Sequence, residues 1–139
     1  MEQNKVAGQS RSIESLNLVK ASETGFEFEL KNSAGTGLGV YLTVRGDHSD
    51  AIRAASRREV NAFRERAFQA SKNRETLPPD PIEDDEAKAI EGAVLRIISW
   101  RGLDEPCTPD NARLLCTVNP EVRAQVYAAS AQSANFMTV

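Results

Sequence analysis

Residues 26–44, FEFELKNSAGTGLGVYLTV, decide the fold class of this chain because two alternating apolar and polar runs flank a turn-rich segment. The two runs place apolar side chains on one face of each strand: Phe26, Phe28, Leu30, Leu38, Val40, Leu42 and Val44. A period of two on both sides of a glycine-containing loop predicts a β-hairpin, which we place at residues 25–46. A two-stranded hairpin is marginal alone in water, so its apolar face needs a helix, another strand or another copy of the chain.

The segment after the hairpin predicts a long basic helix at residues 49–74, on which we expect the hairpin to pack. Ser49 or Asp50 offers an N-cap, and neither proline nor glycine occurs in the rest of this segment. From Asp50 to Glu75 there are seven basic and four acidic side chains, a net charge of +3. An approximate apolar stripe runs along this helix: Ile52, Ala55, Val60, Phe63 and Ala67.

An acidic linker comes next at residues 76–84, where prolines end the basic helix. From Thr76 to Gly92 there are six acidic side chains and one basic side chain, Lys88, a net charge of −5.

The region 85–137 then predicts three helices. The first carries a regular apolar stripe that ends at the only tryptophan of the chain: Ala87, Ile90, Val94, Ile97, Ile98 and Trp100. Gly102 then signals the end of this helix.

Two start signals predict the second and third of these helices. Thr108 is an N-cap followed by Pro109, and Asn119 and Pro120 repeat the pattern. The three helices would form a corner in which Trp100 packs against Leu114 or Leu115. The whole pattern predicts a predominantly helical α+β fold, with one domain at residues 25–139 that follows a flexible N-terminal segment, residues 1–24.

The composition limits the classes of protein to which the chain belongs. Its 139 residues suit one domain, and an aromatic content of only 6% predicts a modest core that a homo-oligomer would help to stabilise. The net charge of −3 argues against nucleic acid as the main partner. We expect no membrane span and no signal peptide, and therefore a cytoplasmic protein. Cys107 and Cys116 are expected to be free thiols, although their spacing leaves a disulfide open.

No set of residues predicts catalysis, a metal site or a cofactor. His48 is the only histidine, and its neighbours in DHSD are too close in sequence to converge as a triad. Cys107 and Cys116 with one distant histidine do not make a zinc site. The glycines of AGTGLG (34–39) lack the Lys–Ser/Thr of a phosphate loop and precede a strand, so we interpret them as a hairpin loop. We therefore expect a protein that is not an enzyme.

The order of these elements resembles the tail assembly chaperones of long-tailed bacteriophages. The resemblance rests on TGFEFELKNSAGTGLGVYLTVRGDHSD (24–50), a basic helix with two adjacent arginines and an acidic linker. It continues through AIEGAVLRIISWRGL (89–103) and TPDNARLLCTVNPEVRAQVYAASAQSANF (108–136). In that family a tryptophan after an apolar helix, a short capped helix, a Pro-x-Val/Ile start and a terminal phenylalanine recur in this order.

The resemblance implies a protein that is not catalytic and is absent from the mature virion. It would bind the tape measure protein, keep it soluble and recruit tail tube subunits around it. Many relatives also exist as a longer form made by a programmed translational frameshift, which would be a further partner. Two other functions stay open from the residues alone: a structural tail or head-completion component, and a small nucleic-acid-binding regulatory protein that uses the arginine-rich helix.

Eight residues are candidates for contacts with partners. Four lie on the apolar face of the hairpin, two are adjacent arginines of the basic helix, and two are aromatic residues of the C-terminal region: Phe26, Phe28, Val40, Leu42, Arg57, Arg58, Trp100 and Phe136. For the hairpin residues and Trp100, simple packing in the core is the competing interpretation.

Overall fold

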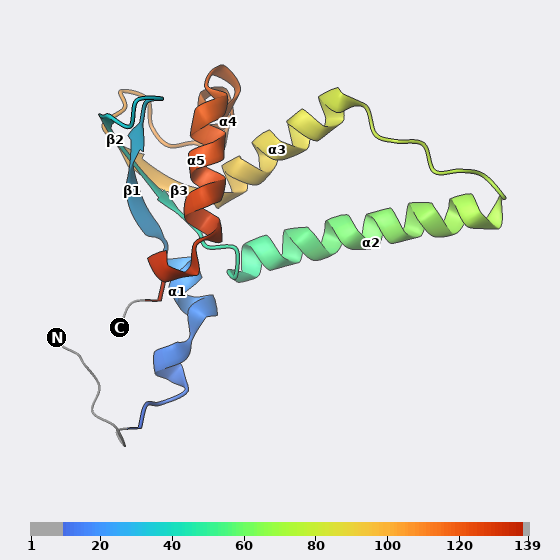
Figure 1. Ribbon diagram of the computed structural model, residues 1–139, viewed down its shortest axis with the longest axis horizontal. Helices are drawn as coiled ribbons and strands as arrows, with labels where there is room; N and C mark the ends of the chain where they lie inside the picture. Colours follow the sequence, from blue (N-terminus) through green and yellow to red (C-terminus); the bar gives the residue numbers. More distant parts are fainter. Residues whose placement is uncertain (1–9, 138–139) are drawn as a thin grey trace.

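The computed structural model describes residues 10–137 and consists of a sheet, a layer of helices on it and a long helical projection (Figure 1). The antiparallel sheet has the order β1-β2-β3, with β1 (Phe26–Lys31), β2 (Gly37–Val44) and β3 (Ile97–Arg101). The α-helices are α1 (Leu18–Thr24), α2 (Asp50–Lys72), α3 (Ile82–Arg96), α4 (Pro109–Val118) and α5 (Pro120–Ala131). Two short 3₁₀ turns are η1 (Glu14–Leu16) and η2 (Ser133–Asn135). The α+β class is therefore confirmed.

The predicted hairpin is present, and its turn is held by one side chain. β1 pairs with β2 so that Phe28 lies opposite Leu42. In the turn, the Asn32 side-chain oxygen accepts hydrogen bonds from the backbone N–H groups of Ala34 and Thr36, at 2.9 and 3.0 Å. An asparagine that bonds the backbone two residues on is a common way to close such a turn.

Residues 97–101 correct the predicted end of the first of the three C-terminal helices, because they form β3 rather than a helical turn. α3 ends at Arg96, and the backbone of Ile97 is already extended. Trp100 lies opposite Leu42 of β2. Isoleucine and tryptophan favour strands, and the unpaired edge of β2 supplies the hydrogen bonds that stop the helix. The apolar period alone could not show that this edge would be adjacent.

Gly102 directly follows β3, at a point where the chain passes very close to β2. Its φ is +94°, and a Cβ there would collide with the backbone oxygen of Gly39. A residue with a side chain would be strained by the backbone angle and blocked by the neighbouring strand. The glycine is thus required by the end of a strand, rather than by the helix end that the sequence suggested.

The hairpin packs on α5, which corrects the expectation that it packs on the basic helix. The Gln125 side chain accepts from the backbone N–H of Lys31 and donates to the oxygen of the same residue, both at 2.9 Å. Ser130 donates to the backbone oxygen of Arg45 at 2.6 Å. Val122 and Val126 of α5 lie in the same core as the apolar face of the hairpin. The short C-terminal helices thus supply the apolar surface that a charged α2 does not.

The basic helix begins as predicted but lies almost wholly outside the core. Ser49 is its N-cap and accepts from the N–H of Ile52, at 3.3 Å. Ile52 is also its only buried residue. After residues 73–81 the chain returns along α3, which begins at Ile82, earlier than predicted. We call residues 50–96 the arm; Figure 1 shows it projecting from the body that the sheet, α4 and α5 form.

Part of the predicted flexible N-terminal segment is folded. Residues 1–9 of that segment lie outside the described residues. Residues 18–24 form α1, whose Asn17 cap accepts from the N–H of Lys20. Ser22 of α1 is fully buried, and its backbone oxygen accepts from the N–H of Gly46 at 2.9 Å. α1 is therefore attached to the turn between β2 and α2. Within residues 10–137, no helix is both long and apolar enough to cross a bilayer.

The buried core predicts how two leucines of the same strand differ. Leu42 is fully buried, whereas Leu38 is 48% exposed. We expect Leu42→Ala to lower the free energy of unfolding by about 2–5 kcal/mol, because it leaves a cavity in the core. Leu38→Ala, the matched control, should change it by about 0.5 kcal/mol or less. Urea denaturation followed by circular dichroism measures both, and equal losses would contradict this assignment of the core.

Candidate functional site

The structure separates the eight candidate contact residues into two groups. Six belong to the core or pack against it: Phe26, Phe28, Val40, Leu42, Trp100 and Phe136. The rings of Phe26 and Phe136 meet edge to face, with centroids 6.0 Å apart. The hairpin face is therefore occupied by the protein's own helices. Arg57 and Arg58 are the two that stay exposed, and neither forms an ion pair with a described residue.

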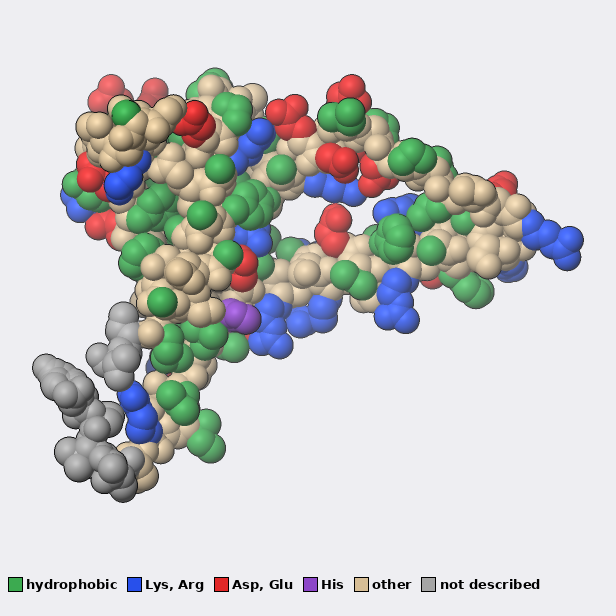
Figure 2. Space-filling view, in the orientation of Figure 1, with side chains coloured by type: hydrophobic (Ala, Val, Ile, Leu, Met, Phe, Trp, Pro, Cys, Tyr) green, Lys and Arg blue, Asp and Glu red, His purple; other side chains and the backbone are tan. Residues whose placement is uncertain are grey.

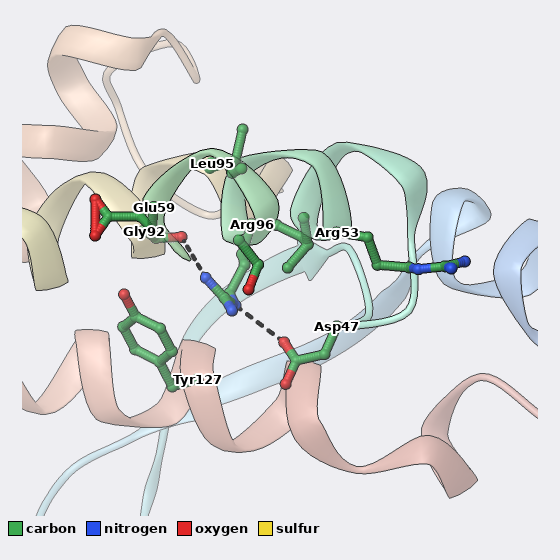
Figure 3. Close-up of a pocket in the computed structure, with 10 residues that line it drawn as sticks. Asp47, Arg53, Glu59, Gly92, Leu95, Arg96 and Tyr127 are labelled. Carbon is green, nitrogen blue, oxygen red and sulfur yellow. Dashed lines mark hydrogen bonds and ion pairs between the residues drawn. The ribbon is translucent and has the colours of Figure 1, made fainter. Parts of the chain in front are cut away.

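Arg96 holds the base of the arm through one contact within α3 and contacts with two other segments (Figure 3). Its Nε donates to Asp47 at 3.1 Å, and a terminal nitrogen donates to the backbone oxygen of Gly92 at 2.9 Å. Its guanidinium lies 4.5 Å from the centre of the Tyr127 ring. The Arg96 side chain is only 14% exposed. A charge buried to this degree needs partners of this kind, and Asp47 and the Tyr127 ring supply them.

Tyr127 connects α5 to α3 in the same network. Its hydroxyl donates to the backbone oxygen of Ala89 at 2.8 Å. A Cβ at Gly92 would overlap this hydroxyl, so glycine is needed in the middle of α3 to let the tyrosine approach. Burial raises the pKa of Tyr127, which keeps the hydroxyl protonated and able to donate.

A cleft opens between α2 and α3 above this network. Two adjoining hollows of about 410 and 450 Å³ share Ala55, Glu59, Gly92 and Leu95 in their walls. Figure 2 shows the opening between the two helices, with basic side chains along α2 and acidic side chains around the start of α3. Lys88 of α3 lies 3.9 Å from Glu59 of α2. The cleft is thus lined by apolar residues and by charged residues of both signs.

The described residues show no arrangement suited to acid–base or nucleophilic chemistry at this cleft. Asp47 is already paired with Arg96. His48 is exposed on the turn before α2. Within residues 10–137 no group of three or more histidine, cysteine, aspartate and glutamate side chains could hold a metal ion. Cys107 and Cys116 are free thiols, and burial raises the pKa of each, which disfavours the reactive thiolate.

A separate hollow, which we call the Trp100 groove, lies outside the cleft on the body, where β3 meets α4. It measures about 170 Å³ and is mainly apolar; its lining residues are Trp100, Leu103, Glu105, Asn111, Leu114, Leu115 and Val118. The predicted neighbours of Trp100, Leu114 and Leu115, therefore do lie beside it. Leu114 and Val118 are 57% and 68% exposed. One turn of helix separates them, so both face the same side of α4.

Hydrogen bonds between side chains and the backbone fix the walls of the Trp100 groove. The indole N–H of Trp100 donates to the backbone oxygen of Glu105 at 2.8 Å. The Asn111 side chain donates to the oxygen of Pro106 at 2.9 Å. Thr108 caps α4 by accepting from the N–H of Asn111. The loop of residues 102–108 is thereby held against both β3 and α4, so the groove exists before any partner binds.

Sequence reasoning missed the Arg96 network. Its members come from positions 47, 92, 96 and 127, and only the fold brings them together. The one local signal was Gly92 inside an otherwise regular helical pattern, where a glycine usually has a packing reason. The Trp100 groove was partly foreseen, because the sequence placed Trp100 beside the short capped helix.

The Arg96 network predicts a strong difference between two arginines of the arm. We expect Arg96→Met to lower the free energy of unfolding by about 1–3 kcal/mol, since it removes charged hydrogen bonds and leaves Asp47 without its partner. Arg58→Met, the control on the exposed surface of α2, should change it by about 0.5 kcal/mol or less. Urea denaturation measures both values. Indistinguishable variants would show that Arg96 does not hold the base of the arm.

Comparisons of the chain with protein-family models, with curated proteins and with solved structures find no match. No relative therefore supplies a function for the groove or for the arm. What can be proposed for this protein rests on the geometry of these two features and on the order of motifs in its sequence.

Proposed function

We propose that the protein is a non-catalytic tail assembly chaperone of a long-tailed bacteriophage. It binds the tape measure protein, keeps it soluble and brings tail tube subunits to it in the host cytoplasm, and it leaves before the virion is mature. The observation that supports this function best is the Trp100 groove, a preformed apolar hollow that remains open to solvent on the body.

Two of the motifs that carry the resemblance, the tryptophan and the short capped helix, build the groove. Trp100 forms one wall, and the short capped helix that follows it, α4, forms the other with Leu114, Leu115 and Val118. The Pro120 start of α5 follows directly and joins the groove to the core through Val122. The tryptophan and the capped helix of the motif order thus share one surface, whereas the terminal Phe136 packs on Phe26 in the core.

The groove suits one apolar side chain of a helical client. A tape measure protein is a long helical client, and an amphipathic helix binds such hollows through side chains three or four residues apart. The exposed side chains of Leu114 and Val118 extend the apolar surface of the hollow, and contiguous apolar surface is where partners bind. Keeping a client soluble requires no chemistry, only a surface that covers its apolar residues.

The charge beside the groove favours a basic segment of the client. The loop that forms one edge carries Asp104 and Glu105, which form no ion pair with a described residue. Opposite charges around an apolar contact speed association and set the orientation of the partner more than they add affinity. We therefore expect the bound client helix to carry lysine or arginine next to its apolar anchors.

The arginines of α2 support a second candidate, binding to nucleic acid. Arg53, Arg57 and Arg64 lie along one shallow surface of α2, and none pairs with a described acid. Retention on DNA that falls steeply with salt would support this function. The net charge of −3 for the whole chain opposes it.

The groove can be tested by placing charges in it. In co-expression with the tape measure protein of the same genome, wild type should keep the client soluble and co-purify with it. The variant Leu114→Glu with Val118→Glu should lose about tenfold or more in affinity, because buried carboxylates would replace apolar contacts. The fold should survive, since both side chains are exposed in the free protein.

Leu38→Glu is the matched control, because Leu38 is an exposed leucine on β2 and lies outside the groove. It should bind the client like wild type. If the groove variant and the control bind equally, the client does not use the groove. If wild type itself leaves the client insoluble and nothing co-purifies, the chaperone function is wrong.

A further inference from the structure

The outer part of α2 lacks the neighbours that a long helix normally needs. Its 23 residues span about 34 Å, whereas the 15 residues of α3 span about 22 Å. The two helices lie side by side at the ion pair between Lys88 of α3 and Glu59 of α2. Figure 1 shows α2 continuing well beyond the start of α3. Helices in proteins owe most of their stability to packing, so residues 60–72 are poorly supported by their own chain.

An apolar stripe marks the side of this outer part that a partner would cover. Val60, Phe63, Ala67 and Ala70 follow one another at spacings of three, four and three residues, which places them on one face. Val60 and Phe63 are each 52% exposed. A stripe with this spacing is the pattern by which one helix packs along another.

The charges on the arm show which partner fits. Residues 60–72 carry Arg64, Arg66 and Lys72 against Glu65, a net charge of +2. Residues 82–88 carry four acids against Lys88, a net charge of −3. Among the described residues Lys88 is the only basic group of these two segments in an ion pair, and residues 83–85 are in none. The chain thus carries two complementary surfaces that do not satisfy each other.

We propose that a second copy of this chain covers the outer part of α2. The two arms cross antiparallel near Arg64, so that residues 60–72 of each copy lie against the start of α3 of the other. Within each copy Lys88 lies beside Glu59. A crossing centred near Arg64 therefore places Arg64 and Arg66 of one copy beside residues 83–85 of its partner. The apolar stripes meet at the centre, and the acids neutralise the arginines that flank them.

The crossing explains why the partner is an identical chain. Each copy offers one basic and one acidic surface, and a two-fold axis pairs both at once, which closes the assembly at two copies. A basic helix packed only on another basic helix would be repelled. Nucleic acid would meet the acids of α3 beside the arginines. The dimer does not rest on the proposed client, since the Trp100 groove belongs to β3 and α4 rather than to the outer part of α2.

Light scattering coupled to size exclusion tests the proposal on the full chain. Wild type at low salt should have the mass of two protomers, and the dimer should weaken as salt rises, because the pairs are exposed to solvent. The variants Arg64→Glu with Arg66→Glu, and Asp84→Lys with Asp85→Lys, should each have the mass of one protomer. Glutamate and lysine are good helix formers, so circular dichroism should stay unchanged.

Mixing the two charge-reversed variants is the decisive measurement. The mixed pair has two contacts between α2 and α3. In one contact both helices carry reversed charges, and in the other both carry their native charges, so each contact is attractive and the mass of two protomers should return. Arg11→Glu with Lys20→Glu, which makes the same change in net charge as the arginine reversal but away from the outer part of α2, should remain dimeric. Phe63→Ser should weaken the dimer without altering charge.

Four results would overturn the proposal. The first three are a monomeric wild type at low salt, dimers that survive either charge reversal, and a mixture of the two variants that stays monomeric. The fourth is retention of DNA by the α2 arginines of the wild type, together with an arginine-reversed variant that has the same mass as the wild type. A dimer that forms normally in the Leu114→Glu with Val118→Glu variant would separate this interface from the client site.

Discussion

The position of Arg96 is the constraint on which the rest of the molecule depends. It is the last residue of α3 and the residue before β3, and its side chain reaches Asp47 and the ring of Tyr127. Its backbone oxygen also accepts from the N–H of Arg45 beside β2, at 2.7 Å. One residue therefore sets where the helix stops, where the third strand begins and how α3 leaves the body. A largely buried guanidinium has few alternative arrangements, because each one would leave a charge without a partner.

The molecule divides its two candidate surfaces between parts that are stabilised differently. The body is held by burial, with Leu42, Val44 and Val126 fully inside. A groove built on it is rigid and is suited to recognising the shape of an apolar side chain. The arm is held at its base and is solvated along most of α2. A surface of this kind depends on complementary charge and on a partner helix, so the two surfaces should respond differently to salt.

Local signals predicted the elements whose physics is local. The hairpin, the Ser49 cap and the Thr108–Pro109 and Asn119–Pro120 starts depend on residues a few positions apart, and all are present. β3 was missed because its apolar residues continue the spacing of a helix while also favouring a strand. The free edge of β2, which decides between them, lies more than fifty residues earlier in the sequence. The packing partner of the hairpin was assigned wrongly for the same reason.

The sequence by itself determined the α+β class, the hairpin, the helix starts and the segregation of basic and acidic charge, because alternation, capping and charge are properties of neighbouring residues. Only the tertiary structure decided that the hairpin face is covered by α5, that Trp100 and α4 form an open groove, and that the outer part of α2 lies beyond the reach of α3. These outcomes depend on which distant surfaces meet and how far each helix extends past the other. Contacts of that kind are set by the competition among all apolar faces of the chain for burial in one core.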